Sequence, residues 1–290
     1  MKIKNKKLAF SLIELSITLL IIGIMYASFS TGSKMLEASR KKAAGSLTNS
    51  SPVLATSDLV IWYETSLNSS FDLRNTNDGQ SLSDFDGVSW FNNAPTKDNN
   101  ASIAIGSPSY RQDAINGLPA VFFNGSSALN FDSSPFNQRY ITAFIVEQRR
   151  GTTTGLLTSN RILRIDDNNF GYLDSDSITL GVDFEKSVTA FGSLQPRIIT
   201  LLLGSRNPNS RGIFVNGGIG SIPAATADDN QLSAPNSIGQ IGKGNTNDDS
   251  YYIGDIAEII IYNRNLTLRE RNNIQNYLGE KYNISVTDSI

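Results

Sequence analysis

Carboxylates are the side chains of this chain best suited to chemistry, because the sequence contains neither histidine nor cysteine. That composition excludes a Ser-His-Asp triad, a cysteine nucleophile, a zinc site of His or Cys ligands and any disulfide. Haem ligation by histidine is excluded for the same reason. Any chemistry must therefore rest on carboxylates, hydroxyls, amides, lysine and arginine.

Asp183 and Glu185 stand two residues apart in a strand-like segment, so both would point to the same face. Glycoside hydrolysis needs such a pair of carboxylates. Glycosidases built on a β-sandwich carry a longer Glu-x-Asp-x-x-Glu run, and here Gly181 occupies the position of its first Glu. We therefore expect that the chain is not an enzyme.

Two further groups of residues could bind ligands. Asp166, Asp167, Asp248 and Asp249 lie in turn-like segments, and their oxygen atoms suit calcium. Neither segment matches an EF-hand loop, so solvated turns are the alternative interpretation. Similarly, the rings of Trp62 and Trp90 could stack on a sugar or could belong to the core.

The segment between Leu8 and Phe29 is apolar, and Glu14 is its only charged residue. As a helix it is long enough to cross a hydrocarbon core of ~30 Å. Lysines precede it, so the positive-inside rule predicts a cytoplasmic N-terminus. A carboxylate at membrane depth costs about 2.5–3.5 kcal/mol, which indicates a function for Glu14. A simple membrane anchor and a cleaved secretory signal are the alternatives.

Residues 7–15 (KLAFSLIEL) resemble the processing motif of type IV prepilins and pseudopilins. The resemblance implies that a prepilin peptidase cuts between Ala9 and Phe10 and that Phe10 is then N-methylated. It also implies that Glu14 pairs with the N-terminal ammonium of a neighbouring subunit during assembly. The family usually has glycine before the cut, and this chain has Ala9.

The rest of the chain divides into a helix, a linker and a β-rich region. After a leader of residues 1–9, we expect a transmembrane and assembly helix over residues 10–45 and a linker over 46–54. Strand-like runs follow, separated by turn residues such as Asn216 and Gly217. They are residues 59–63, 120–123, 141–146, 162–165, 178–182, 197–203, 212–215 and 253–262. Thr267 and Glu270 fit a capping box that opens a C-terminal helix.

The β-rich region is similar to laminin-G-like, concanavalin A-like domains. The likeness rests on residues 116–125 (NGLPAVFFNG), on residues 254–267 and on residues 277–282. It implies a two-sheet antiparallel β-sandwich of the jelly-roll type over residues 55–284, closed by the C-terminal helix and followed by a tail of residues 285–290. The expected fold class is therefore mainly β, with one long N-terminal helix.

Together the two resemblances imply a minor type IV pilin-like subunit that displays a binding or adhesion head. A pseudopilin of a type II secretion system and a membrane-anchored carbohydrate-active enzyme are the alternatives. The expected partners are a prepilin peptidase, other pilin-like subunits, the bacterial cytoplasmic membrane and a glycan or protein ligand. The net charge of −2 gives no indication of nucleic-acid binding.

Overall fold

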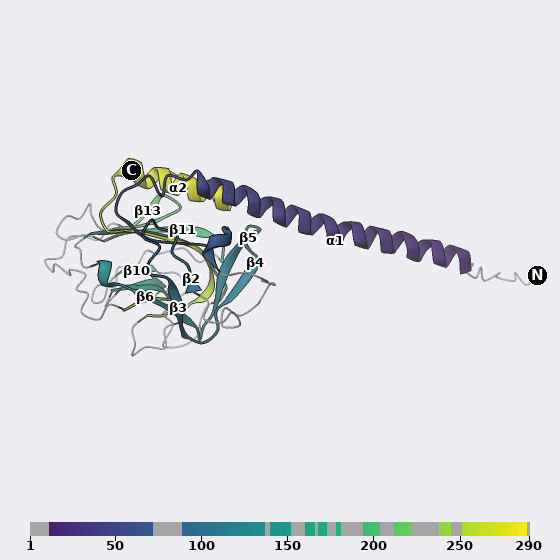
Figure 1. Cartoon of the computed structure of the whole chain (residues 1–290), viewed down its shortest axis with the longest axis horizontal. Helices are drawn as coiled ribbons and strands as arrows, with labels where there is room; N and C mark the ends of the chain where they lie inside the picture. Colours follow the sequence, from purple (N-terminus) through teal and green to yellow (C-terminus); the bar gives the residue numbers. More distant parts are fainter. Residues whose placement is uncertain are drawn as a thin grey trace, which may run out of the picture. The chain divides into compact units, whose positions relative to one another are not determined.

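A computed structural model describes residues 12–71, 89–136, 140–151, 160–165, 168–172, 178–180, 194–203, 212–221, 238–244 and 251–288. The chain forms two compact units, residues 1–40 and residues 41–290. The first unit consists of most of the helix α1 (Leu12–Asn49). The second contains the end of α1, all the strands and the C-terminal helix α2 (Leu268–Tyr282) (Figure 1).

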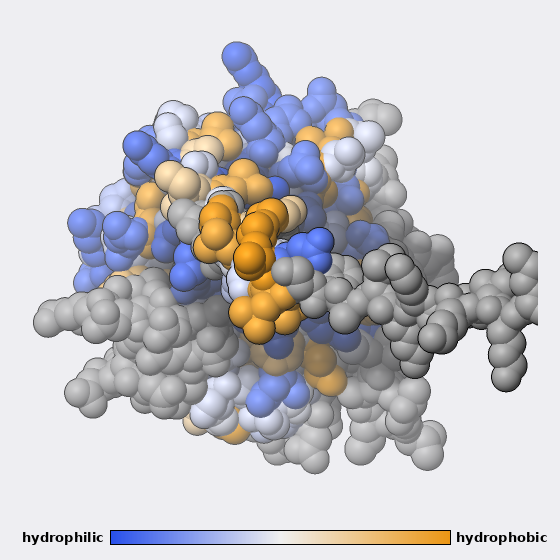
Figure 2. Space-filling view, turned by 90° about the vertical axis from the view of Figure 1, so that its right-hand side faces the viewer, coloured by the Kyte–Doolittle hydropathy of each residue, from blue (hydrophilic) through white to orange (hydrophobic). Residues whose placement is uncertain are grey.

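Helix α1 has 38 residues and runs past Gly45, where the sequence predicts its end. A glycine inside a helix costs only about 1 kcal/mol, and the buried residues Ala44 and Thr48 on the last two turns offset that cost by packing. At the other end of α1, apolar side chains are exposed (Figure 2). Among the described residues, no helix is long and apolar enough to cross a membrane. The expected transmembrane helix is therefore not supported.

The strands of the described part form two antiparallel sheets, one of eight strands and one of seven. The first sheet has the order β13-β12-β11-β7-β15-β5-β4, with β1 also paired to β15, and the second has the order β10-β9-β8-β14-β6-β3-β2. The bounds are β1 (Leu59–Glu64), β2 (Ser89–Trp90), β3 (Ala101–Ile105), β4 (Ser109–Ile115), β5 (Leu118–Asn124), β6 (Ala128–Asp132), β7 (Ile141–Arg149), β8 (Asn160–Ile165), β9 (Asn168–Tyr172), β10 (Ile178–Leu180), β11 (Arg197–Leu203), β12 (Gly212–Val215), β13 (Gly218–Ser221), β14 (Ile238–Ile241) and β15 (Ile253–Tyr262). The mainly β fold with two antiparallel sheets and a C-terminal helix is confirmed.

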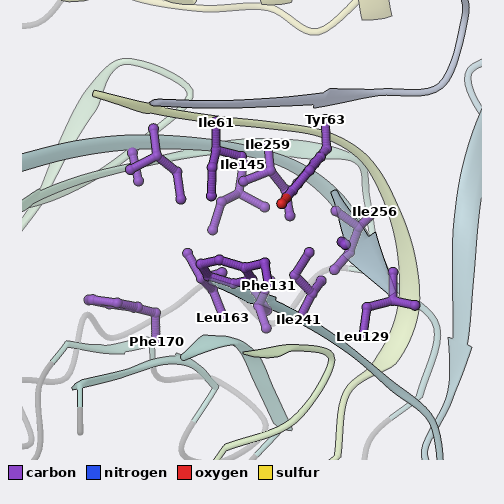
Figure 3. Packing of buried hydrophobic residues seen from close by; sticks show 14 of the residues in the cluster. Ile61, Tyr63, Leu129, Phe131, Ile145, Leu163, Phe170, Ile241, Ile256 and Ile259 are labelled. Atoms are coloured by element: carbon purple, nitrogen blue, oxygen red, sulfur yellow. The ribbon is translucent and has the colours of Figure 1, made fainter. Parts of the chain in front are cut away.

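The two sheets face each other across one apolar core. Figure 3 shows Ile61, Ile145 and Ile259 of the first sheet pointing toward Phe131 and Leu163 of the second. A second apolar cluster lies on the outer face of the first sheet, where Ile260 and Phe144 pack with Ile274 and Leu278 of α2. The first sheet is thus covered on both faces, which is why β15 reads as an almost continuous apolar run.

A β-bulge in β15 changes which side chains reach the outer face. Ile256 pairs with Glu147 and Glu258 pairs with Val146, so Ala257 is the extra residue. Ile256 belongs to the core between the sheets, whereas Ala257 belongs to the outer cluster. The bulge therefore places the side chains of both Asp255 and Glu258 on the outer face, although they are three residues apart.

The predicted turn and cap residues are confirmed. Asn216 and Gly217 have φ values of 50° and 81°, as a two-residue hairpin turn between β12 and β13 requires. Thr267 accepts a hydrogen bond from the backbone of Glu270, and the Glu270 side chain accepts one from the backbone of Thr267. Helix α2 thus begins with the capping box that the sequence predicts.

Candidate functional site

The N-terminal half of α1 carries a surface of exposed apolar side chains. Leu12 is 82% exposed and Ile13 is 69% exposed. The same surface continues through Leu15, Ile17, Leu19, Leu20, Ile21, Ile22, Ile24, Met25 and Tyr26. These positions cover every face of the helix, because successive residues are turned by about 100°. A continuous apolar surface of this kind marks an interaction site.

Glu14 lies in the first turn of α1, among these apolar residues, and its side chain is exposed. The hydroxyls nearby serve the helix itself: Thr18 Oγ1 donates to the carbonyl oxygen of Glu14, and Ser16 Oγ donates to that of Leu12, both at 2.7 Å. Glu14 therefore places one carboxylate among the exposed apolar side chains of residues 12–26. Ala9 and Phe10, the predicted cleavage site, lie outside the described residues.

The structure places both predicted sugar-stacking residues in the interior. Trp62 is 2% exposed and Trp90 is wholly buried. The indole nitrogen of Trp62 donates to Glu258 Oε1 at 2.7 Å, and that of Trp90 donates to the carbonyl oxygen of Glu64 at 2.7 Å. The ring of Trp90 stacks on Phe71 with 5.9 Å between centroids. Both tryptophans therefore support the core and present no ring face to a ligand.

The predicted calcium ligands Asp166, Asp167, Asp248 and Asp249 lie outside the described residues, as do Asp183 and Glu185. Among the residues that are described, no group of three or more acidic side chains is placed to hold a metal ion. The calcium site thus stays a prediction.

A buried ionic cluster joins α2 to the first sheet. Lys281 Nζ lies 2.7 Å from Glu258 Oε2 and 3.2 Å from Glu64 Oε2, and all three side chains are wholly buried. Tyr277 and Tyr282 each donate to Glu258 at 3.0 Å. Since the cluster holds two carboxylates and one ammonium group, hydrogen bonds from neutral groups must stabilise the remaining negative charge.

Glu64 receives those hydrogen bonds from the segment that follows β1. The backbone N–H groups of Ser66 and Leu67 donate to its two carboxylate oxygens at 2.8 and 2.7 Å, and the hydroxyls of Ser66 and Ser70 donate as well. Burial by itself raises the pKa of Glu64, but Lys281 and these hydrogen bonds outweigh it and lower that pKa. Burial opposes the charge of Lys281 too, while Glu258 raises its pKa. The charged forms of Glu64 and Lys281 are therefore favoured, and their contacts join α2 to the sheet.

The end of α1 reaches this buried cluster. Thr48 Oγ1 lies 3.4 Å from Ser66 Oγ and 3.3 Å from the hydroxyl oxygen of Tyr277. Thr48 is itself 1% exposed. The last turn of α1 is thus packed into the second compact unit, residues 41–290, which we call the head.

A second charged group lies on the outer face of the same sheet, and its two arginines are partly exposed to solvent. We call Arg111, Phe122, Arg150 and Asp255 the arginine–aspartate cluster. Arg150 Nε lies 2.5 Å from Asp255 Oδ2, and Arg111 Nη1 lies 3.6 Å from Asp255 Oδ1. The Arg111 guanidinium also stacks on the Phe122 ring, 3.3 Å from its centroid. Asp255 is wholly buried, whereas Arg111 and Arg150 are 36% and 35% exposed.

Burial raises the pKa of Asp255, and the two arginines only partly offset that effect. Sequence reasoning singled out neither this cluster nor Glu258. The signal that could have found both is the presence of Asp255 and Glu258 in an otherwise apolar strand, because a buried carboxylate requires cationic or hydrogen-bonding partners.

Comparison with known proteins adds information on the fold. No family model matches the chain, and no curated protein sequence matches it either. Among solved structures, the chain is similar to the sialidase of Trypanosoma rangeli in complex with 2,3-difluorosialic acid, at 12% identity and a TM-score of 0.50. That match covers 89% of this chain and 39% of the sialidase.

Two other structures are similar. A mutant of the same sialidase with trans-sialidase activity matches at 13% identity and a TM-score of 0.50, over 87% of this chain and 39% of that one. Domain 4 of an extracellular GH43 arabinanase from Geobacillus stearothermophilus, in complex with arabinotriose, matches at 14% identity and a TM-score of 0.47. The match covers 76% of this chain and 98% of that domain.

These likenesses correct one expectation. The sequence predicts that the chain is not an enzyme, and this is contradicted by structural neighbours that are glycoside hydrolases. At this level of identity the likeness shows a shared fold. The architecture of the head is thus one that hydrolytic enzymes contain.

Proposed function

We propose that this chain is a filament subunit of the type IV pilin kind, assembled through α1 and carrying the β-sandwich as a binding head. The observation that carries the proposal is the apolar surface around the N-terminal half of α1, where Leu12 is 82% exposed. Water is a poor solvent for such a surface, so a stable form of the protein must cover it. Copies of the same helix, packed side by side, would cover every face of it.

Glu14 gives this packing its register. The residues around it offer little solvation for a carboxylate once helices pack together, so a cationic partner is required. Removal of residues 1–9 would create an ammonium group at Phe10, four residues before Glu14. A neighbouring copy, shifted along the helix axis, would bring its ammonium group to this carboxylate. The pair would then fix the stagger between subunits.

The head would be displayed outside the bundle of helices, where it is free to bind a ligand. Its two-sheet fold supports the laminin-G-like, concanavalin A-like assignment in the coarse sense that both are antiparallel β-sandwiches. The proposed location is the bacterial cell envelope. There the chain would first associate with the cytoplasmic membrane and would later be incorporated into a pilus. A head of this size on every subunit would crowd a thin filament, so we propose a minor subunit.

Mass spectrometry of the mature N-terminus tests the proposal. The full chain is expressed together with a prepilin peptidase, and the expected product begins with N-methylated Phe10. Ala9→Gly serves as the control that should be cut at least as well, whereas Ala9→Leu places a bulky residue before the cut and should block processing. A chain that keeps Met1, or one that begins near Phe29, would overturn the pilin assignment.

A further inference from the structure

The arginine–aspartate cluster lies on the part of β15 that precedes the residues in hydrogen-bond contact with α2. Helix α2 contacts β15 at Ala257 and Glu258 through Tyr282 and Lys281. Asp255 lies on the other side of the bulge, where β15 pairs with β5 and β7. The Arg111 and Arg150 side chains beside it are each about one-third exposed, so a ligand could reach them from solvent.

A row of side chains crosses the sheet at this point. Ser109 pairs with Phe122, Phe122 with Asp255, and Asp255 with Gln148. Residues directly opposite one another in antiparallel strands project to the same face, so the four side chains form a line across β4, β5, β15 and β7. Gln148 Nε2 donates a hydrogen bond to the carbonyl oxygen of Leu194 at 2.9 Å. This bond orients the Gln148 side-chain amide, whose Oε1 can act as an acceptor. The row thus combines a hydroxyl, a ring, a carboxylate and an amide.

The charges in the cluster do not balance. Two guanidinium groups face one carboxylate, so one positive charge remains. Arg150 already binds Asp255 Oδ2 at 2.5 Å and donates to the carbonyl oxygen of Ala114 at 2.7 Å. Arg150 thus binds one carboxylate oxygen of Asp255, and Arg111 adds a second positive charge beside the other oxygen.

Among the residues that the structure describes, Arg111 donates no hydrogen bond. Its nearest approach to Asp255 is 3.6 Å, beyond hydrogen-bonding distance, and the other contact is the stack on Phe122. Within the described part of the chain, Asp255 Oδ1 accepts no hydrogen bond. A stacked guanidinium keeps its planar fork of N–H groups for an anion. Such a fork matches a carboxylate in a bidentate arrangement.

We propose that Arg111 and Arg150 bind the carboxylate of an acidic sugar residue, with Ser109 and Gln148 contacting its hydroxyls. The single excess positive charge suits a monoanion, and the polar row beside it suits a polyol. The proposal deepens the binding role proposed for the head and rests on it, whereas filament assembly through α1 is not needed for it. It assigns a ligand class and a site to the head.

Titration of the full chain in detergent with two acidic probes, trigalacturonate and sialyllactose, tests the proposal by saturation-transfer NMR. Maltotriose and lactose are the uncharged counterparts. At least one acidic probe should bind, and its uncharged counterpart should bind at least tenfold more weakly. Arg111→Gln should weaken binding of the acidic probe by about tenfold or more, as expected for a lost charge-assisted hydrogen bond.

Two variants make the test specific. Arg269→Gln removes the same charge from an exposed position on α2 and should leave binding unchanged. Arg111→Lys keeps the charge but not the fork, and it should bind less well than the unaltered chain. Equal binding by Arg111→Gln, or equal binding of uncharged probes, would overturn the assigned site or ligand class while the head remains a binding module. Failure of all four probes to bind would overturn both this inference and the sugar-binding role.

Discussion

Glu64 and Glu258 lie directly opposite one another on the neighbouring antiparallel strands β1 and β15. Two like charges in that position destabilise a sheet. Here the ammonium group of Lys281 contacts both carboxylates, at 3.2 and 2.7 Å. The C-terminal helix therefore neutralises a repulsion that the pairing of the strands creates.

Replacing Lys281 with methionine should lower the free energy of unfolding by about 3–5 kcal/mol, because it leaves two buried carboxylates without a cation. Lys42→Met, at an exposed position on α1, is the matched control and should change stability by less than about 0.5 kcal/mol. Urea denaturation followed by tryptophan fluorescence measures both values. Unaltered stability of Lys281→Met would contradict the ionic cluster.

The same variant should respond differently to acid. In the unaltered chain the pKa of Glu64 is lowered, so its contribution to stability is present above the unfolded pKa and is lost as the pH falls. Without Lys281, burial should raise the pKa of Glu64 instead. Protonation of Glu64 at low pH would then remove the unpaired buried charge and stabilise the variant. The difference in stability between the two proteins should therefore shrink as the pH is lowered.

The pair of Arg264 and Glu270 predicts a second pH dependence. Arg264 Nη1 and Nη2 donate to the two carboxylate oxygens of Glu270 at 3.0 and 2.7 Å. Hydrogen bonding to Arg264 is the largest cause that lowers the pKa of Glu270, to about 2 from its ordinary 4.5. Since the folded pKa is depressed, the stabilisation is present above pH 4.5 and is lost as the pH falls toward 2.

Glu270→Gln should therefore be less stable than the unaltered chain above pH 4.5, by about 0.5–1 kcal/mol for a partly exposed pair. Glutamine can still complete the capping box, so the variant isolates the charge. Melting temperatures recorded from pH 7 to pH 2 should converge for the two proteins, while the exposed control Glu280→Gln follows the unaltered chain throughout. Parallel curves would show that Glu270 does not titrate as described.

Gly217 provides a test of the turn that holds the C-terminal tail. It has a φ of 81°, and a Cβ there would lie 1.7 Å from the carbonyl oxygen of Thr287. Gly217→Ala should destabilise the fold by about 1–3 kcal/mol and displace the tail. At Gly218 a Cβ would meet its nearest atom at 3.5 Å, so Gly218→Ala is the neighbouring control. Thermal melting compares the two, and equal melting temperatures would contradict the predicted clash.

Glu14 provides the test of assembly. Replacing it with alanine or glutamine should leave expression and folding of the β-sandwich unchanged but reduce filament incorporation by tenfold or more, because the proposed pair with the ammonium group of a neighbouring subunit could not form. Glu37→Gln removes the same charge from a later turn of α1 and should assemble normally. Sheared-filament preparations, probed by immunoblot, measure incorporation. Normal incorporation of Glu14→Ala would contradict the pairing.

Much of the head could be predicted from local sequence. Strands β11, β12 and β15 coincide with predicted runs because each is a mostly apolar stretch bounded by turn residues. The capping box of Thr267 and Glu270 and the turn at Asn216 and Gly217 were predictable because their chemistry is local. Strand β4 gave no such signal, because Arg111, Gln112 and Asp113 interrupt it and it lies at the edge of its sheet.

The ionic cluster and the arginine–aspartate cluster could not be predicted in this way. Each depends on the bulge at Ala257, which places Glu258 and Asp255 on one face, and a bulge has no fixed sequence signature. The burial of Trp62 and Trp90 likewise depends on which strands pair, because both indoles donate to groups of β1 or β15. These features depend on which strands pair, and in which register, between segments that are far apart in the sequence.

The pairing of β1 with β15 also has a mechanical consequence. A pull transmitted along α1 would reach the β-sandwich first at the last turn of the helix, where Thr48 contacts Ser66 and Tyr277, and then at β1, the first strand after the helix. The antiparallel backbone bonds between Leu59–Glu64 and β15, together with the ion pair of Lys281 and Glu64 at the end of the strand, would hold β1 in the sheet. A head built in this way would resist tension at the point where a tether joins it.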